Sequence, residues 1–174
     1  MGKTEEMASK LKYLSSYSDD LQGQVLDMID KKTLREYLLS KYPDKHAVAN
    51  DKSLHRYVVS LKNHYLKKSS PLSKVVYDNK IHVIHHALGL HTFISRNHGG
   101  KLKSKNEIRI SHVFKNTPEE FLNMIVVHEL AHLKEKEHNK AFYKFCQHML
   151  TDYFQLEFDM RVYLTQLDLF GEIY

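Results

Sequence analysis

The chain has 174 residues, enough to bury a hydrophobic core without disulfides. Hydrophobic residues make up 42% and charged residues 27%, and only three prolines and six glycines are present, which excludes long disordered linkers. The net charge of +5 permits contact with nucleic acid but does not require it. The single cysteine, Cys146, excludes an internal disulfide and is expected to be a buried core thiol.

The N-terminal residues have no apolar leader, and no apolar run is long enough to span a membrane. A cytoplasmic protein with no membrane partner is therefore expected. Residues 1–18 are predicted to form a weakly ordered lead-in. Helical periodicity then begins at Asp19 and ends at Tyr42, because the residue before a proline is pushed out of the helical region. A second helix is predicted from Asp51 to Lys67. This helical pair defines an N-terminal region of residues 1–68, followed by a second domain of residues 69–174.

The second domain begins with short strand patterns rather than helical ones. Glu107–Ser111 alternates polar and apolar residues, as a half-buried strand does. Residues 75–77 lead into a turn at Asp78-Asn79, and strands are predicted at 81–84, 90–94 and 107–111. Together with the surrounding helices, they predict an α+β fold with a small mixed sheet.

A strong helix start follows at Thr117-Pro118-Glu119-Glu120. Thr117 is expected to cap the helix, Pro118 to take its first position, and Glu120 to complete a capping box. The apolar run 124–127 should anchor this helix on the core. Further helices are predicted at about 140–150 and 153–166.

The predicted helix carries the segment His128-Glu129-Leu130-Ala131-His132. Two histidines four positions apart stand on one face of a helix, so both can bind one metal ion. Glu129 is rotated by about 100° from His128, where it can take a proton from a metal-bound water. This is the arrangement of His-Glu-x-x-His zinc hydrolases, with Glu129 as general base.

A catalytic zinc needs a third protein ligand and an open position. His138 is the first candidate, and Asp152 and Glu157 are the alternatives. If the helix continued, His138 would point away from His132, so the chain must turn over residues 134–137. Asn139 can cap the next helix.

The segment from His128 to Phe142 resembles the YgjP-like family of bacterial metallopeptidase-type domains. That family reads His-Glu-Leu-x-His, five residues, then a histidine and a nearby phenylalanine, and Asn106–Ser111 matches its upstream strand. The resemblance covers about residues 70–165. It implies a zincin-type fold in residues 69–174, with Zn²⁺ bound by His128, His132 and His138.

The family usually carries a Trp-Gly-Ser-type segment where this chain has Ser95–Gly100, so the substrate groove is expected to differ. In zincins a strand edges the cleft, and Glu107–Ser111 is the candidate for holding an extended peptide. A cluster of four histidines and a basic run offer weaker metal and phosphate sites. They are His82, His85, His86 and His91, and Arg96, Lys101, Lys103 and Lys105. An oxyanion stabiliser is expected among Arg109, His112, Tyr143, Tyr153 and Arg161.

The sequence thus predicts a zinc metallopeptidase acting on a peptide or protein substrate, in which Glu129 activates water. Three alternatives remain open. A zinc hydrolase could cleave a non-peptide bond such as a nucleotide phosphoanhydride. The chain could also be a nucleic-acid-associated protein, or a domain with structural zinc.

Overall fold

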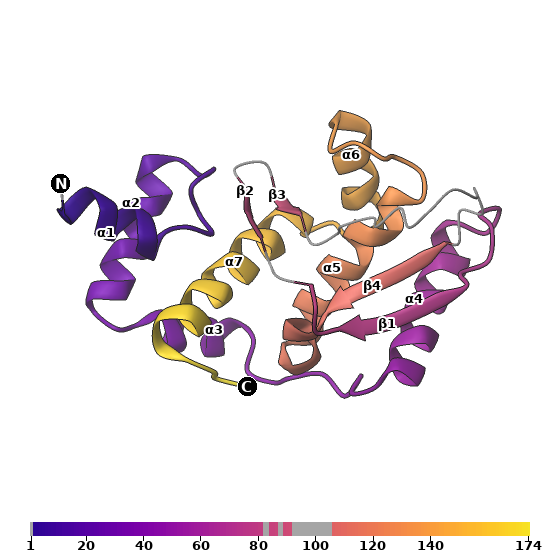
Figure 1. The fold of residues 1–174 in the computed structure, drawn as a ribbon, viewed down its shortest axis with the longest axis horizontal. Helices are drawn as coiled ribbons and strands as arrows, with labels where there is room; N and C mark the ends of the chain where they lie inside the picture. Colours follow the sequence, from indigo (N-terminus) through magenta and orange to yellow (C-terminus); the bar gives the residue numbers. More distant parts are fainter. Residues whose placement is uncertain (1, 82–83, 87–88, 92–105) are drawn as a thin grey trace.

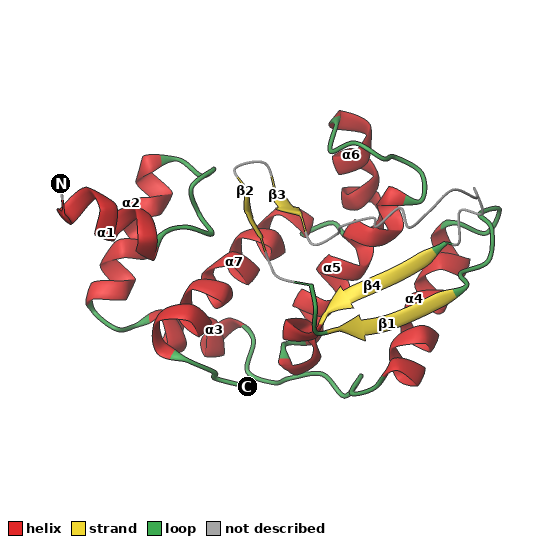
Figure 2. Ribbon diagram, in the orientation of Figure 1, coloured by secondary structure: helices red, strands yellow, loops and turns green. Residues whose placement is uncertain are grey.

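The fold is known from a computed structural model, which describes residues 2–81, 84–86, 89–91 and 106–174. It has the predicted α+β character, with helices and two small, separate pairs of strands (Figures 1 and 2). The helices are α1 (Gly2–Lys10), α2 (Asp19–Asp30), α3 (Leu34–Lys41), α4 (Asp51–Tyr65), α5 (Glu119–His132), α6 (Lys140–Met149) and α7 (Tyr153–Phe170), with a short 3-10 helix η1 (His112–Asn116). The strands are β1 (Lys74–Asp78), β2 (Ile84–His86), β3 (Gly89–His91) and β4 (Glu107–Ser111).

The first eighteen residues are more ordered than predicted. They form α1 and a tight connection in which Leu11 and Leu14 are buried. Ser18 then caps α2 by accepting a hydrogen bond from the backbone N–H of Leu21. The prediction of a weakly ordered lead-in was wrong, because two leucines anchor this segment on the core.

The predicted helix from Asp19 to Tyr42 is divided into α2 and α3. Lys32 adopts the left-handed backbone conformation, with φ of 56°, and ends α2. The backbone N–H of Thr33 donates to the carbonyl of Met28 at 2.9 Å, and α3 begins at Leu34. The break turns α3 along α7, so residues 19–41 pack as two helices (Figure 1).

Helix α4 packs beside β1, and β1 pairs with β4 in parallel. Asn50 and Ser53 form a reciprocal capping box at the start of α4. In β4, Ile108 and Ile110 are buried, which confirms the alternation read from the sequence. The parallel register pairs Lys74 with Glu107 and Asp78 with Ser111. This pair places β4 next to α5.

The second pair of strands is β2 and β3, which are antiparallel and form their own sheet. Both pairings of the predicted mixed sheet therefore occur, but in two separate two-stranded sheets. The predicted strands 81–84 and 90–94 lie only partly within the described residues. The segment 95–100, the basic run and the side chains of the histidine cluster lie outside them.

The start of α5 differs in detail from the prediction. Pro118 occupies the N-cap position, and Thr117 makes no cap hydrogen bond to the helix. Instead the Thr117 hydroxyl donates to the carbonyl of Phe114, 3.1 Å away, and is fully buried. The predicted capping box was wrong, because this hydroxyl closes the turn from η1 rather than the first turn of the helix.

Helices α5 and α7 form the centre of the molecule. Every residue of α5 from Met124 to Ala131 is buried, as the apolar run predicts for a helix anchored on the core. Helix α3 attaches to α7 through Asp159, a fully buried carboxylate. Among the described residues, no helix has the length and apolar character needed to cross a membrane.

The Asp159 carboxylate accepts three hydrogen bonds from the α3 side. Tyr37 donates at 2.6 Å, Lys41 at 2.7 Å, and Tyr42 donates to the same oxygen as Lys41. Burial alone would raise the pKa of Asp159, but these hydrogen bonds lower it below the ordinary value. Residues of both predicted regions thus share one core, and the boundary at residues 68 and 69 stays a prediction.

Candidate metal centre

The C-terminal turn of α5 places the two motif histidines on one face of a buried helix. His128 is only 4% exposed, whereas His132 lies at the helix end and is partly exposed. Their rings are 4.9 Å apart. The four-residue spacing therefore produces the geometry predicted from the helix period.

His138 reaches the same point because the chain turns sharply after His132. Backbone N–H groups of Lys134 and Glu135 both donate to the carbonyl of Ala131, and Asn139 caps α6 through the N–H of Phe142. Within the described residues, Lys32 is the only non-glycine residue with positive φ, so this turn is built without strained backbone. A glycine is not needed because no residue of this turn has a positive φ.

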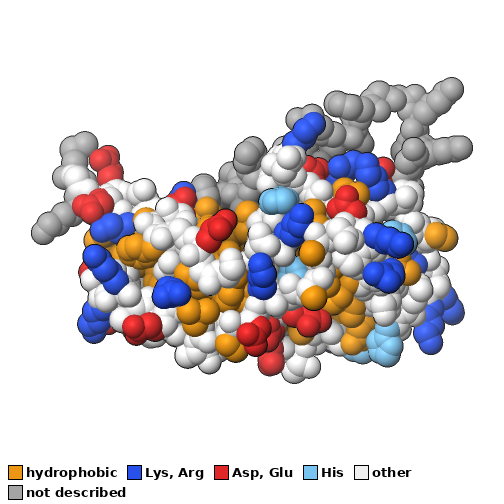
Figure 3. Space-filling view, turned by 90° about the horizontal axis from the view of Figure 1, so that it is seen from below, with side chains coloured by type: hydrophobic (Ala, Val, Ile, Leu, Met, Phe, Trp, Pro, Cys, Tyr) orange, Lys and Arg blue, Asp and Glu red, His pale blue; other side chains and the backbone are white. Residues whose placement is uncertain are grey.

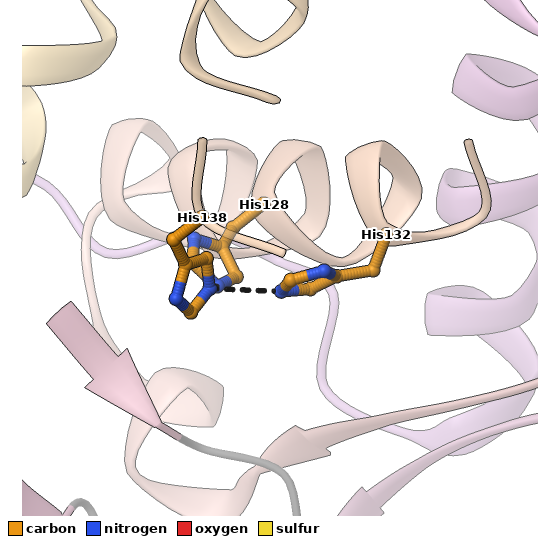
Figure 4. Close-up of side chains that lie close together, drawn as sticks. All are labelled: His128, His132 and His138. Carbon is orange, nitrogen blue, oxygen red and sulfur yellow. Dashed lines mark hydrogen bonds between the residues drawn. The ribbon is translucent and has the colours of Figure 1, made fainter. Parts of the chain in front are cut away.

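The three histidines converge through their Nε2 atoms (Figure 4). The Nε2 atom of His138 lies 3.0 Å from that of His132 and 3.2 Å from that of His128. One ring nitrogen from each residue falls within 4.8 Å of the others. Tetrahedral coordination at a metal–nitrogen distance of about 2.05 Å would separate ligand nitrogens by about 3.3 Å. The spacing therefore fits a single metal ion.

The ring orientations favour the same conclusion. Nδ1 of His132 lies 3.0 Å from the carbonyl oxygen of Glu135, which can only accept a hydrogen bond. Nδ1 must therefore carry the proton, and in a neutral ring Nε2 is left with a lone pair. That lone pair points toward the other two Nε2 atoms, as a metal ligand requires.

Two aromatic residues enclose the histidines. Phe142 of α6 packs against all three, with ring centroids 4.6–5.0 Å away. Tyr143 lies next to His138 at 6.3 Å. Phe142 is fully buried and walls one side of the centre with apolar surface. The low-polarity wall strengthens electrostatic interactions at the centre.

The three histidines, His128, His132 and His138, are called the triad below. Glu129 lies beside the triad and has an unusual environment. Its side chain is almost fully buried, and its Oε1 atom is 3.9 Å from Nε2 of His128. This oxygen has no hydrogen-bond partner among the described residues. Burial raises the pKa of the carboxyl well above its ordinary value. An unpaired acceptor in this position is suited to a water molecule at the metal.

The sequence-based alternatives for the third ligand lie elsewhere. Asp152 is exposed at the start of α7. The carboxylate of Glu157 pairs with Arg161 at 3.3 Å. Burial raises the pKa of Glu157, against the opposing effects of Arg161 and a hydrogen bond with Tyr153.

Of the residues considered as oxyanion stabilisers, Tyr143 and Tyr153 lie next to the three histidines, whereas Arg109 and His112 line a separate cavity. Arg109 is held by ion pairs to Asp78 and Glu107, at 3.0 and 3.3 Å. With His112, it lines an open cavity of about 390 Å³. A second cavity of about 540 Å³ lies between Tyr13, η1 and the C-terminal half of α7. No triad histidine appears among the described residues that line either cavity.

Comparison with known proteins agrees with this geometry. The model of the YgjP-like metallopeptidase domain matches residues 94–162. A "UTP pyrophosphatase" from Escherichia coli (strain K12) is 57% identical over 161 residues, which cover 92% of this chain and 96% of the relative. The chain belongs to the YgjP-like family. No solved structure matches it. Family membership and the three-histidine cluster together indicate a metal-dependent hydrolase.

Proposed function

We propose that the protein is a zinc-dependent nucleotide hydrolase that cleaves UTP to UMP and pyrophosphate. The main support for a hydrolytic activity is the buried Glu129 oxygen, which has no hydrogen-bond partner among the described residues and lies beside three convergent ring nitrogens. Support for the substrate is the 57% identity, over nearly both full lengths, to a protein named UTP pyrophosphatase. The proposal agrees with the alternative of a zinc hydrolase that cleaves a nucleotide phosphoanhydride, and not with the metallopeptidase that the sequence predicts first.

His128, His132 and His138 would hold the zinc ion, which suits neutral imidazole ligands. Bound there, zinc would polarise a phosphoryl oxygen and lower the pKa of a coordinated water to about 7. Glu129 accepts the proton of the attacking water at Oε1. The water oxygen bonds to the α-phosphorus, the bond to the bridging oxygen breaks, and Glu129 returns the proton to the departing pyrophosphate.

Peptide hydrolysis is a second candidate. The matching family model describes a metallopeptidase domain, and the His-Glu-x-x-His arrangement is that of zinc peptidases. In addition, β4 pairs only with β1 among the described residues, and an extended peptide bound as a further strand would pair with its other edge. Nucleic-acid binding has less support. On the face shown in Figure 3, Lys and Arg side chains are spread along the molecule with acidic ones between them.

One assay separates these functions. Zinc-loaded wild-type protein and Glu129→Gln are incubated with UTP, CTP, ATP and GTP, and pyrophosphate and monophosphates are quantified by chromatography. A mixed peptide library is treated in parallel and read by mass spectrometry. UTP cleavage by the wild type and not by Glu129→Gln supports the proposal. Peptide cleavage without nucleotide cleavage would replace it with the second candidate.

A further inference from the structure

A row of buried polar side chains lies behind His128 on helix α7. Tyr153, Glu157 and Arg161 are spaced four residues apart, so they stand one turn above another on the same face of the helix. Tyr153 is fully buried, Arg161 is 4% exposed, and the Glu157 side chain is 13% exposed. These three residues are called the polar row below.

The polar row is connected end to end. Nδ1 of His128 lies 2.8 Å from the Tyr153 hydroxyl oxygen. Tyr153 is hydrogen-bonded to Glu157, and Arg161 donates to Glu157 at 3.3 Å. Arg161 also donates to the backbone carbonyl of Tyr13 at 2.8 Å. A continuous path of polar contacts therefore runs from a proposed metal ligand to the N-terminal region.

The donor and the acceptor in each of these hydrogen bonds can be assigned by starting from Arg161. A guanidinium has donors but no acceptor, so Glu157 accepts from it, and Arg161 favours the carboxylate form of Glu157 against the effect of burial, which raises its pKa. A carboxylate can only accept, so the Tyr153 hydroxyl donates its proton to Glu157. The tyrosine oxygen, which is also hydrogen-bonded to the Cys146 thiol, can then accept the Nδ1 proton of His128 through its lone pairs.

We propose that the polar row positions His128 by holding it in the tautomer that presents the Nε2 lone pair to the metal. This inference rests on the proposed metal site but not on the identity of the substrate. Metal-ligating histidines are commonly oriented through their second ring nitrogen, and loss of such a partner weakens metal binding. The polar row performs this role through a tyrosine, whose orientation depends on a buried carboxylate and an arginine.

The same geometry gives the N-terminal region a part in the metal site. Arg161 is fixed not only by the carbonyl of Tyr13 but also by the ring of Tyr17, with the guanidinium carbon 5.8 Å from its centroid. Tyr17 in turn packs edge-on against Phe158 at 5.2 Å. The connection between α1 and α2 therefore secures the far end of the polar row.

The test compares zinc affinity in Tyr153→Phe and Glu157→Gln with that of the wild type. Zinc dissociation constants are measured by competition with a chromogenic chelator. Each substitution nearly preserves shape, and each is expected to weaken zinc binding about 10–100-fold. Asp159→Asn is the matched control, because Asp159 is a buried carboxylate on the same helix that contacts α3 instead of His128. It should retain wild-type zinc affinity even if its thermal midpoint falls.

A second readout reports on the His128 ring itself. In zinc-loaded protein with ¹⁵N-labelled histidine, the Nδ1 proton of His128 should give a slowly exchanging NMR signal. In Tyr153→Phe that signal is expected to shift upfield and exchange faster, because its acceptor is gone. Folded Tyr153→Phe and Glu157→Gln proteins with wild-type zinc affinity and an unchanged His128 signal would overturn the inference. Wild-type protein that binds zinc but cleaves no nucleotide would refute the proposed function and leave this test intact.

Discussion

Glu129 and Asp159 are both acidic side chains buried in the helical core, but their surroundings differ. Asp159 is fully buried and accepts hydrogen bonds from Tyr37, Lys41 and Tyr42. Glu129 is also buried, yet its Oε1 atom has no partner among the described residues. The pKa of Asp159 is lowered, whereas burial raises that of Glu129.

Under the proposed function, the difference separates a carboxylate that connects two helices from one that is available to accept a proton. Burying a charged group is costly unless donors compensate it, and at Asp159 they do. At Glu129 the cost is left uncompensated, next to three histidine nitrogens that fit a cation. Substitutions at these two regions should therefore affect different properties of the protein.

The largest effect is expected from removing a proposed ligand. Purified His132→Ala protein should bind no zinc after dialysis, whereas the wild type should retain a stoichiometric amount, measured by mass spectrometry. Two ligands cannot hold the ion as three do. The control is His148→Ala, since His148 is an exposed histidine on α6. Equal loss of zinc in both variants would contradict the assignment of the triad.

Glu129→Gln should act on the reaction rather than on metal binding. Loss of the general base is expected to lower kcat for UTP by about 10²–10⁴-fold, with zinc content unchanged. Because the neutral amide avoids burying a charge, the thermal midpoint of the zinc-free protein should stay the same or rise. A Glu129→Gln enzyme with wild-type kcat would show that Glu129 is not the base.

Asp159→Asn should instead lower stability. The amide keeps one acceptor but cannot satisfy the donors of α3, and the expected cost is about 1.5–3 kcal/mol in the free energy of unfolding. Urea denaturation measures it. Asp168→Asn serves as the control, because Asp168 is an exposed partner of Lys12 on the same helix and should cost less than about 1 kcal/mol. Equal losses of unfolding free energy in the two variants would show that Asp159 contributes no more to stability than an exposed ion pair does.

The smallest and most specific effect concerns pH. Because the pKa of Asp159 is lowered by folding, its contribution is present above the unfolded value of about 3.9 and disappears as pH falls through the lower folded value. The stability difference between wild type and Asp159→Asn should be constant from about pH 5 to 7 and shrink below about pH 4. A difference that instead grew on acidification would contradict the lowered pKa.

The triad could be predicted because its geometry is local. The helix period places His128 and His132 on one face, and the polar turn with Asn139 returns His138 to them. The sequence also indicated that the helix around Glu129 is anchored on the core, because the apolar run 124–127 comes directly before the motif. Both features depend on spacing within one short segment.

The polar row could not be recognised in this way. Tyr153 and Arg161 were considered as oxyanion stabilisers and Glu157 as a metal ligand. Their four-residue spacing was visible, but its meaning depends on how α7 packs behind α5 and on the carbonyl of Tyr13 far along the chain. The parallel pairing of β1 with β4 was likewise unpredictable, because it joins segments more than thirty residues apart.

The short turn between α5 and α6 has a consequence for dynamics. His128 and His138 are ten positions apart, so coordination would close a small loop at little entropic cost. The bound ion would then cross-link the end of one helix to the beginning of the next. Helix α6, which packs on α5, would be protected from local unfolding by the metal itself, and its amide hydrogens would exchange faster once a chelator removes the ion.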